Sequence, residues 1–424
     1  MKFNSLCVLG MGYIGLPTAS LFASNGMHVH GMDINADIIE DLQAGIPHIF
    51  EPGLRGLVLD ALQSGRLTIS KEVHPADVFY IAVPTPFYED KRADLRAVVS
   101  ATESILPHLL PGNLVILEST SPPRTTCDIV APILEKRGLK AGQDFLLAYS
   151  PERVFPGRIL RELVDNPRVI GGVNRVSAEA GRDLYHKVVK GEIILTDATT
   201  AEMVKLMENT SRDINIAIAN EFSRLAEVFN VDIWEAIKIA NLHPRIEILR
   251  PGVGVGGHCI SVDPWFLVEA APEHAQLIKL ARQINDQQPE FVAQHIEAVV
   301  EELAGKVIAF LGLSFKANVD DLRESPAIKL VGHLERRGAQ VLAYEPFRSE
   351  AGLPGVTQVS HLDQALLNAD LIVLAVAHNQ FKDLDPHIIR TKTPASSVYD
   401  AVYAWDKTRW EGAGFKFYGL ARKY

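Results

Sequence analysis

The sequence predicts an α/β protein built from two Rossmann-like, doubly wound domains that are joined by a long central helix and a helical dimerisation region. A short apolar run, a glycine turn and a helical pattern follow one another near the start of the chain and again after residue 302. This alternation of strand and helix is typical of parallel sheets. Residues 199–231 contain no proline or glycine, as expected of one long helix. We therefore expect domains at residues 1–198, 199–302 and 303–424.

The bulk composition is that of a globular protein, with 424 residues, 47% hydrophobic and 22% charged, and a net charge of −10. This acidic balance argues against nucleic-acid and membrane partners, and no uninterrupted apolar run is long enough to cross a bilayer. Three cysteines without regular spacing argue against a disulfide scaffold and against a metal site. Glycines break the apolar start of the chain, and no small-residue cleavage site follows it. We therefore expect a cytoplasmic protein.

The first glycine turn has the spacing G-x-G-x-x-G between an apolar run and a helical pattern, and the next apolar run ends in Asp33, 18 positions after the last glycine. In a dinucleotide site such glycines let the backbone approach the pyrophosphate at the helix N-terminus, and the acid binds the ribose hydroxyls. Asp33 would also repel a 2′-phosphate, so the sequence predicts NAD as the cofactor. A glycine-rich turn that binds nothing is the alternative. The expected cofactor residues here are Gly10, Gly12, Tyr13, Ile14, Gly15 and Asp33.

Three later apolar runs, in ADVFYIAVPTPF, NLVILEST and DFLLAYSPER, end in small or polar residues. Their carboxyl ends carry Thr85, Thr120 and Glu152. Singly, each residue could be a cap. Because the carboxyl ends of parallel strands meet at one sheet edge, the three together predict a cofactor crevice.

The C-terminal part repeats this pattern in residues 306–347, and ADLIVLAVAHNQF echoes ADVFYIAVPTPF. The second copy lacks the full glycine motif but carries Lys316 and Arg323 in its loop. It resembles a Rossmann-like domain adapted to another phosphate ligand, with a copy that only packs as the alternative.

The long helix is expected to begin with Thr199 or Thr200 as its N-cap and to span roughly 45 Å at ~1.5 Å per residue. Lys205, Asn209 and Arg212 recur at i, i+4 and i+7, so they share one stripe. Two cations and an amide without an acid favour a ligand-binding face over a solvated one.

Cys259 follows a glycine run, whereas Cys7 and Cys127 fit small core positions. The glycines leave the backbone bare, which permits close approach of a substrate. A cation such as Lys205 would stabilise the thiolate. Beside an NAD site, a nucleophilic cysteine has a specific use, since it captures an aldehyde as a thiohemiacetal that a second hydride transfer turns into a thioester. A structural cysteine is the alternative.

The motifs GxGxxG with Asp33, PTP, EST, SPER, KLMEN, GVGGHC with DP, and FK…DD.R.SP occur in this order. Together they resemble the UDP-glucose/GDP-mannose dehydrogenase family over almost the entire chain. NTSRDIN, ANLHPR and GGHCISVDPWF are most similar to the branch that oxidises UDP-N-acetylmannosamine. One departure from the usual pattern matters: the stretch VYDAVYAWD near the last strand differs, which leaves the contacts of that strand open.

The resemblance implies a four-electron, NAD-dependent oxidation of a UDP-sugar C6 alcohol to a carboxylate. It implies that Cys259 is the nucleophile, that Lys205 donates or accepts a proton or stabilises the oxyanion, and that Asn209 and Asp263 orient or activate water and the hydroxyl. Which of Lys205, Asp263 and Glu152 is the base in each step stays open. The resemblance also implies a homodimer through the central helices and UDP binding by the C-terminal domain.

The remaining site residues follow from the same resemblance. Residues expected near NAD are Thr85, Thr120 and Arg323, with Thr120 and Glu152 also close to the reacting centre. Residues expected to line the sugar-nucleotide site are Arg153, Val154, Lys205, Asn209, Arg212, His243, Arg245, Gly256, Phe315 and Lys316.

Other functions compete with this one. The same chemistry on UDP-N-acetylglucosamine or UDP-glucose is the nearest, because one hydroxyl configuration separates the two acetamido sugars. A two-electron hydroxyacid dehydrogenase with a structural Cys259 is the second. A non-enzymatic nucleotide-binding regulator is the third, although the reactive positions are all present.

Overall fold

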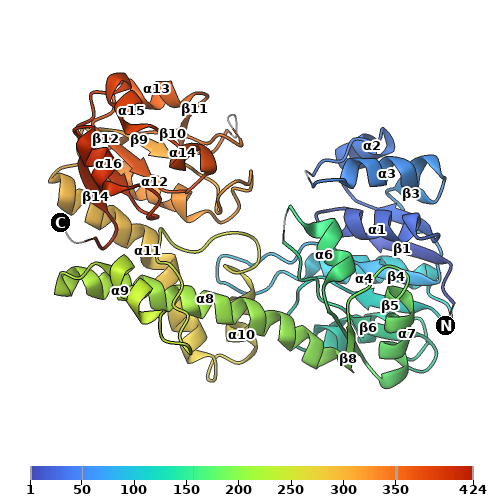
Figure 1. Cartoon of the computed structure of the whole chain (residues 1–424). Coiled ribbons are helices and arrows are strands. Elements are labelled where there is room, and N and C mark those ends of the chain that lie inside the picture. Colours follow the sequence, from blue (N-terminus) through green and yellow to red (C-terminus); the bar gives the residue numbers. More distant parts are fainter. Residues whose placement is uncertain (1, 50, 156, 349–351, 423–424) are drawn as a thin grey trace. The chain divides into compact units, whose positions relative to one another are not determined.

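The computed structural model describes residues 2–49, 51–155, 157–348 and 352–422 (Figure 1). The chain forms two compact units. Unit 1 comprises Met1–Glu208 with Trp265–Pro272, and unit 2 comprises Asn209–Pro264 with Glu273–Tyr424.

Unit 1 is built on a sheet with the strand order β3-β2-β1-β4-β5-β6-β7-β8, in which β7 runs antiparallel to β6 and the other neighbours are parallel. The order 3-2-1-4-5-6 is that of a dinucleotide-binding fold. The strands are β1 (Ser5–Leu9), β2 (His28–Met32), β3 (Leu67–Ser70), β4 (Val78–Ile81), β5 (Leu114–Leu117), β6 (Leu146–Tyr149), β7 (Arg168–Gly172) and β8 (Ile193–Asp197).

Helices cover both faces of this sheet, because successive side chains of its strands point to opposite sides. Leu6 and Val8 of β1 belong to one hydrophobic core, whereas Cys7 and Leu9 belong to the other. Burial raises the pKa of the Cys7 thiol to about 11, which fits a core residue. The helices are α1 (Gly15–Ser24), α2 (Ala36–Gln43), α3 (Leu54–Gln63), α4 (Arg96–Ile105), η1 (Leu106–His108), η2 (Thr126–Val130), α5 (Ala131–Glu135), α6 (Ile159–Asp165) and α7 (Arg175–Tyr185).

Unit 2 contains a parallel sheet with the order β11-β10-β9-β12-β13-β14, which repeats the order of unit 1. Ile308 and Phe310 of its central strand face one core, and Ala309 and Leu311 face the other. The strands are β9 (Val307–Leu311), β10 (Gln340–Tyr344), β11 (Thr357–Val359), β12 (Leu371–Leu374), β13 (Ser397–Asp400) and β14 (Lys416–Gly419). The second Rossmann-like domain is therefore confirmed.

The central helical region supplies α9 and α11 to the first of these two cores. The helices from α8 onward are α8 (Ala198–Phe229), α9 (Ile233–Ala240), α10 (Asp263–Ala270), α11 (Gln276–Val300), α12 (Pro326–Arg336), α13 (Leu362–Leu366), α14 (Asn379–Lys382), α15 (Pro386–Lys392) and α16 (Lys407–Gly412).

The long helix α8 spans Ala198–Phe229, 32 residues, and is labelled in Figure 1. Its N-cap is Asp197, whose carboxylate accepts hydrogen bonds from the backbone amide (2.9 Å) and the hydroxyl (2.5 Å) of Thr200. The expectation that Thr199 or Thr200 caps the helix is therefore wrong. An aspartate is as good a cap as a threonine, and here it stands at the end of β8.

A buried ion pair fixes α8 to α11 within unit 2. Arg282 is fully buried and its Nη1 lies 2.5 Å from Oδ1 of Asp213, which also accepts a hydrogen bond from Asn285 Nδ2 at 2.8 Å. A buried guanidinium needs such partners, because an unpaired charge in a core is costly. In the described part of the chain, no helix combines the length and apolarity needed to cross a membrane.

Candidate active site

The glycine loop between β1 and α1 has two kinds of glycine. A Cβ at Gly10 (φ +95°) would lie 2.6 Å from the backbone oxygen of Ala82, and one at Gly15 would lie 1.8 Å from the oxygen of Gly10. These two glycines permit the turn and the close packing of α1. Gly12 differs, because its Cβ would meet open space, so the loop is bare on the side where a pyrophosphate approaches.

Asp33 follows β2 and is fixed by this loop. One carboxylate oxygen accepts the Met11 amide at 2.9 Å, and the other accepts the Asn35 amide at 2.9 Å. The side chain is half-buried, like Tyr13 and Ile14 on the loop. A bare glycine turn at a helix N-terminus with an oriented carboxylate fits the pyrophosphate and the ribose hydroxyls of NAD.

The loops after β4 and β5 are joined to each other. The hydroxyl of Thr85 donates to the backbone oxygen of Thr120 at 2.6 Å. The hydroxyl of Ser119 donates to the backbone oxygen of Val83 at 2.7 Å. Thr85 is buried and Thr120 is half-buried. The structure thus brings these two predicted residues together at the carboxyl ends of neighbouring strands.

Glu152 lies after β6, and an arginine that sequence reasoning missed holds its side chain. Oε2 of Glu152 lies 2.5 Å from Nη2 of Arg168, and Oε1 accepts the backbone amide of Arg153 at 2.6 Å. Glu118, at the end of β5, was also missed and lies on the other side of the same guanidinium, 4.0 Å away. An arginine at the start of the apolar strand RVIGG was the available signal, because a charge is buried only with a partner.

The other residues expected around Glu152 have defined contacts within unit 1. Arg153 makes an ion pair of 2.7 Å with Glu208 of α8, and Val154 is half-buried. Lys205, also on α8, is only 8% exposed, and its charge favours the ionised form of Glu118.

Asn209 stands one helical turn after Lys205 on α8 and contacts Asp263 in unit 2. Its Nδ2 donates to Oδ2 of Asp263 at 2.5 Å. Asp263 is buried at the start of α10, and its backbone amide donates to the backbone oxygen of Cys259 at 2.8 Å. Three of the expected catalytic residues therefore form one local group.

The loop that carries Cys259 packs on the loop after β9. The backbone amide of Gly257 donates to the backbone oxygen of Arg323 at 3.0 Å. A Cβ at Gly257 (φ +86°) would lie 2.8 Å from the Phe315 ring. A Cβ at Gly256 would lie 2.6 Å from the backbone oxygen of Glu324. Glycine is therefore needed at both positions because Glu324 and Phe315 occupy the space that a side chain would take.

The three cysteines differ in exposure, and Cys127 is less buried than the core position expected of it. Cys259 is exposed, Cys127 is half-buried and Cys7 is buried. Burial raises the pKa of the Cys127 thiol. Beside Cys259, burial and then the charge of Arg323 lower the pKa of His258, so its imidazole is neutral at pH 7.

The remaining predicted substrate residues lie at the surface of unit 2. Arg212, His243, Arg245 and Lys316 are exposed. Arg323 is exposed as well, and its guanidinium lies 2.7 Å from the Asp321 carboxylate.

The second Rossmann-like fold does not repeat the cofactor site of the first. Glu345 follows β10 as Asp33 follows β2, but it is fully buried and accepts the amides of Leu313 (2.8 Å) and Ser314 (2.9 Å). His378, also fully buried, lies 3.2 Å from the same oxygen. The acid that a dinucleotide site would use for ribose is therefore occupied by its own loop.

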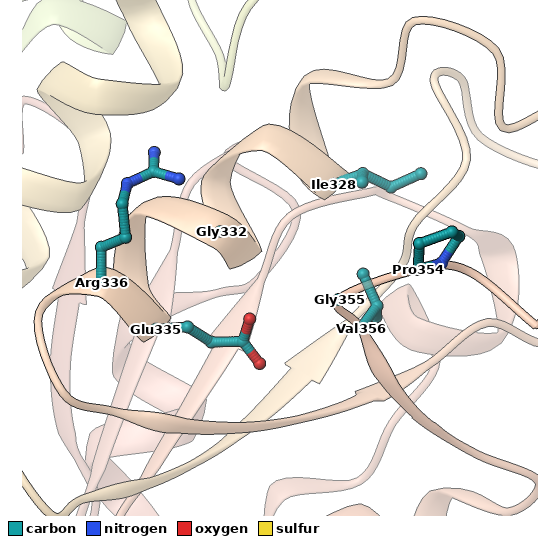
Figure 2. A pocket seen from close by; sticks show the side chains of 7 residues that line it. All are labelled: Ile328, Gly332, Glu335, Arg336, Pro354, Gly355 and Val356. Carbon is teal, nitrogen blue, oxygen red and sulfur yellow. The ribbon is translucent and has the colours of Figure 1, made fainter.

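A surface hollow of about 460 Å³ lies between α12 and the loop before β11 (Figure 2). None of the predicted site residues lines it. Among the described residues, no group of three His, Cys, Asp or Glu side chains could hold a metal ion. The lining residues are Ile328, Gly332, Glu335, Arg336, Pro354, Gly355 and Val356.

Comparison with known proteins gives a match along nearly the whole chain. The UDP-glucose/GDP-mannose dehydrogenase family models match as the NAD binding domain at residues 4–189, the central domain at 199–287 and the UDP binding domain at 309–407.

Individual relatives agree with these matches. A UDP-N-acetyl-D-mannosamine dehydrogenase of Methanocaldococcus jannaschii is 46% identical over 98% of this chain and 96% of its own length. An NDP-N-acetyl-D-galactosaminuronic acid dehydrogenase of Ralstonia solanacearum is 45% identical over 96% of this chain and 98% of its own. The solved structure of a UDP-D-ManNAc dehydrogenase from Pyrococcus horikoshii superposes with a TM-score of 0.91 at 40% identity, covering 99% of both chains.

Proposed function

Because this chain belongs to the UDP-glucose/GDP-mannose dehydrogenase family, and is an NAD-dependent UDP-sugar dehydrogenase, we propose that it oxidises UDP-N-acetyl-D-mannosamine to UDP-N-acetyl-D-mannosaminuronate. The observation that supports this most is the local group of Cys259, Asp263 and Asn209, with Lys205 one helical turn away on α8. These residue types supply a nucleophile, a carboxylate, an amide and a cation.

We propose that the residues act in the following order. Bound NAD supplies the acceptor for each hydride. A base, Lys205, Asp263 or Glu152, takes the C6 hydroxyl proton as the first hydride leaves, which gives the aldehyde. The Cys259 thiolate then bonds to the aldehyde carbon, and the oxyanion takes a proton to give a thiohemiacetal.

Loss of that proton and of the second hydride gives a Cys259 thioester. Water, oriented by Asn209 and Asp263, attacks the thioester carbonyl, and the thiolate leaves as the carboxylate forms. The sum is one alcohol, one water and two NAD⁺ converted to one carboxylate, two NADH and three protons.

A homodimer through the central helices is part of the proposal. Apolar side chains on α8 and around α9 and α11 are 40–80% exposed, and those of α8 recur at helical spacing along one face. Contact with a second copy would bury them. They are Ile218, Phe222, Leu225, Val228, Phe229, Ile239, Leu242, Leu277 and Leu280.

We further propose that the enzyme acts in the cytoplasm and supplies an acidic sugar for surface polysaccharide. The relatives named above are dehydrogenases of N-acetylated sugar nucleotides, and a uronate is the product class that such a polymer requires.

The substrate is tested by measuring NADH formed per sugar with UDP-N-acetyl-D-mannosamine, UDP-N-acetylglucosamine and UDP-glucose. UDP-N-acetylgalactosamine belongs in the panel because of the Ralstonia relative. We expect two NADH per UDP-N-acetyl-D-mannosamine and the highest kcat/KM with that sugar. No turnover with it would reject the proposed substrate, and one NADH per sugar would reject the four-electron reaction.

A further inference from the structure

Behind Glu152 lies a buried polar group of unit 1 that no step of the proposed reaction uses. We call it the Arg168 cluster, and its members are Tyr80, Glu118, Arg168 and Tyr185. Each of them is at most 5% exposed. Tyr80, Arg168 and Tyr185 lie on β4, β7 and α7, and Glu118 directly follows β5, so four separate parts of the chain converge on one place.

Arg168 is the centre of this cluster. Its Nη2 lies 2.5 Å from Glu152, whereas its Nη1 lies 4.0 Å from Glu118 and 3.4 Å from the hydroxyl of Ser150. The guanidinium carbon lies 4.5 Å from the centroid of the Tyr185 ring. Such stacking, together with a fixed fork of donors, holds a guanidinium in one plane.

Glu118 competes with Glu152 for this cation but is held by other groups. Its Oε1 accepts the hydroxyl of Tyr80, which in turn accepts the hydroxyl of Tyr185 at 3.0 Å. Its Oε2 has no hydrogen-bond partner among the described residues. The charged or titratable groups around it are Tyr80, Glu152, Arg168, Tyr185 and Lys205.

Protonation of Glu118 resolves this competition. Burial, and then the negative charge of Glu152, raise the pKa of Glu118 to about 8. At neutral pH Glu118 is therefore mostly uncharged and does not compete for the guanidinium of Arg168, which makes its short contact with Glu152.

Such an arrangement adds little to stability, since apolar residues of similar volume commonly stabilise a core at least as well as a buried ion pair does. It does fix a position. Glu152 is bound at one oxygen by Arg168 and at the other by the Arg153 amide, so its carboxylate has one orientation.

We propose that Arg168 and Glu118 are positioning residues that act through Glu152. Arg168 orients the Glu152 carboxylate for the reaction, and Glu118 does not draw Arg168 away from Glu152. The inference rests on the proposed function, because it requires Glu152 to act on the bound substrate.

A double-mutant cycle tests it, with kcat and KM of the wild type, Glu152→Gln, Arg168→Met and the double variant at saturating NAD. We expect Glu152→Gln to lower kcat by about 100-fold, as for loss of an acid–base group. Arg168→Met should lower kcat by roughly 30-fold, with the KM for UDP-N-acetyl-D-mannosamine changed less than about threefold, and should cause almost no further loss in the Glu152→Gln background. The matched control is Arg175→Met, which breaks a surface arginine–glutamate pair of the same unit.

Equal losses from Arg168→Met in both backgrounds would overturn the inference and leave the proposed function intact. Full kcat in Glu152→Gln would overturn the inference together with the role of Glu152. A wild type without turnover on any UDP-sugar would overturn the proposed function and, with it, the inference.

Glu118→Gln gives a second test if Arg168→Met fails to fold. Ionisation of Glu118 above about pH 8 should draw Arg168 away from Glu152 in the wild type, and glutamine cannot ionise. We expect the ratio of the Glu118→Gln kcat to the wild-type kcat to rise by about 20-fold between pH 7 and pH 10, because Glu118 with a pKa of about 8 is almost fully ionised at pH 10 and Glu152 then lacks Arg168, as it does in Arg168→Met. A constant ratio would overturn the part assigned to Glu118, because a merely structural role would not change with pH.

Discussion

Replacing Glu118 by glutamine has a consequence for stability that can be worked out from its surroundings. The pKa of Glu118 rises from its ordinary 4.5 to about 8, first because the side chain is buried and then because of the Glu152 carboxylate. Between these two pH values the folded chain keeps a proton that the unfolded chain has released. Unfolding therefore becomes more favourable as the pH rises.

The magnitude follows from linkage. Each pH unit in this window costs about 1.4 kcal/mol of unfolding free energy, so the wild type loses about 5 kcal/mol between pH 4.5 and pH 8 through this one group. Below pH 4.5 and above pH 8 the contribution is flat. Glutamine can still accept the Tyr80 hydroxyl but does not titrate, so Glu118→Gln lacks this loss.

The assay is thermal unfolding of both proteins between pH 5 and pH 8. A chain with two units need not unfold in one step, so the transition of unit 1 is followed. About 1 kcal/mol shifts the Tm of a domain of this size by about 2–4 °C. The Tm of Glu118→Gln minus the Tm of the wild type should therefore increase by roughly 10 °C from pH 5 to pH 8. Glu179→Gln, at an exposed ion pair, is the control and should show no such gain. A Tm difference that is independent of pH would refute the reasoning, since it would mean that Glu118 is ionised throughout.

Three further predictions concern the proposed site and assembly. Cys259→Ser should lower the rate of uronate formation by orders of magnitude, measured as the rate of NADH release, because a serine hydroxyl is a much weaker nucleophile than a thiolate; near-normal turnover would favour a two-electron dehydrogenase. Asp33→Ala should raise the KM for NAD by about tenfold or more, since it removes a charged acceptor worth ~1.5–3 kcal/mol; an unchanged KM would place the ribose elsewhere. Phe222→Asp should give a monomer in light scattering, because it puts a charge on the exposed apolar face of α8; an unchanged mass would move the interface to another surface.

The fold was predictable because its pattern is repeated and local. An apolar run, a turn with glycine and a helix recur in both sheets, and the helix over residues 199–231 lacks breakers, as α8 (Ala198–Phe229) shows. The cap was not predictable in the same way. Asp197 and the two threonines after it are all good caps, and only the end of β8 decides which one serves.

The places of the candidate site residues could be predicted where these residues stand at strand ends or at fixed helical spacing, as Thr85, Thr120 and Asn209 do. Arg168 and Glu118 were missed because a charged residue beside an apolar strand reads as a surface residue until its partner is known. That partner comes from another strand, so the pairing depends on the order of strands in the sheet.

The buried carboxylate of Glu345 links the second sheet to the thiol loop through a chain of contacts. It holds the amides of Leu313 and Ser314, the next residue Phe315 lies against Gly257, and Gly257 is two residues from Cys259. Under the role proposed for Cys259, a substitution of Glu345 should therefore lower turnover by loosening the loop that carries the thiol. Creating a second dinucleotide pocket there would remove the hydrogen bonds that fix the loop against which the Cys259 loop packs.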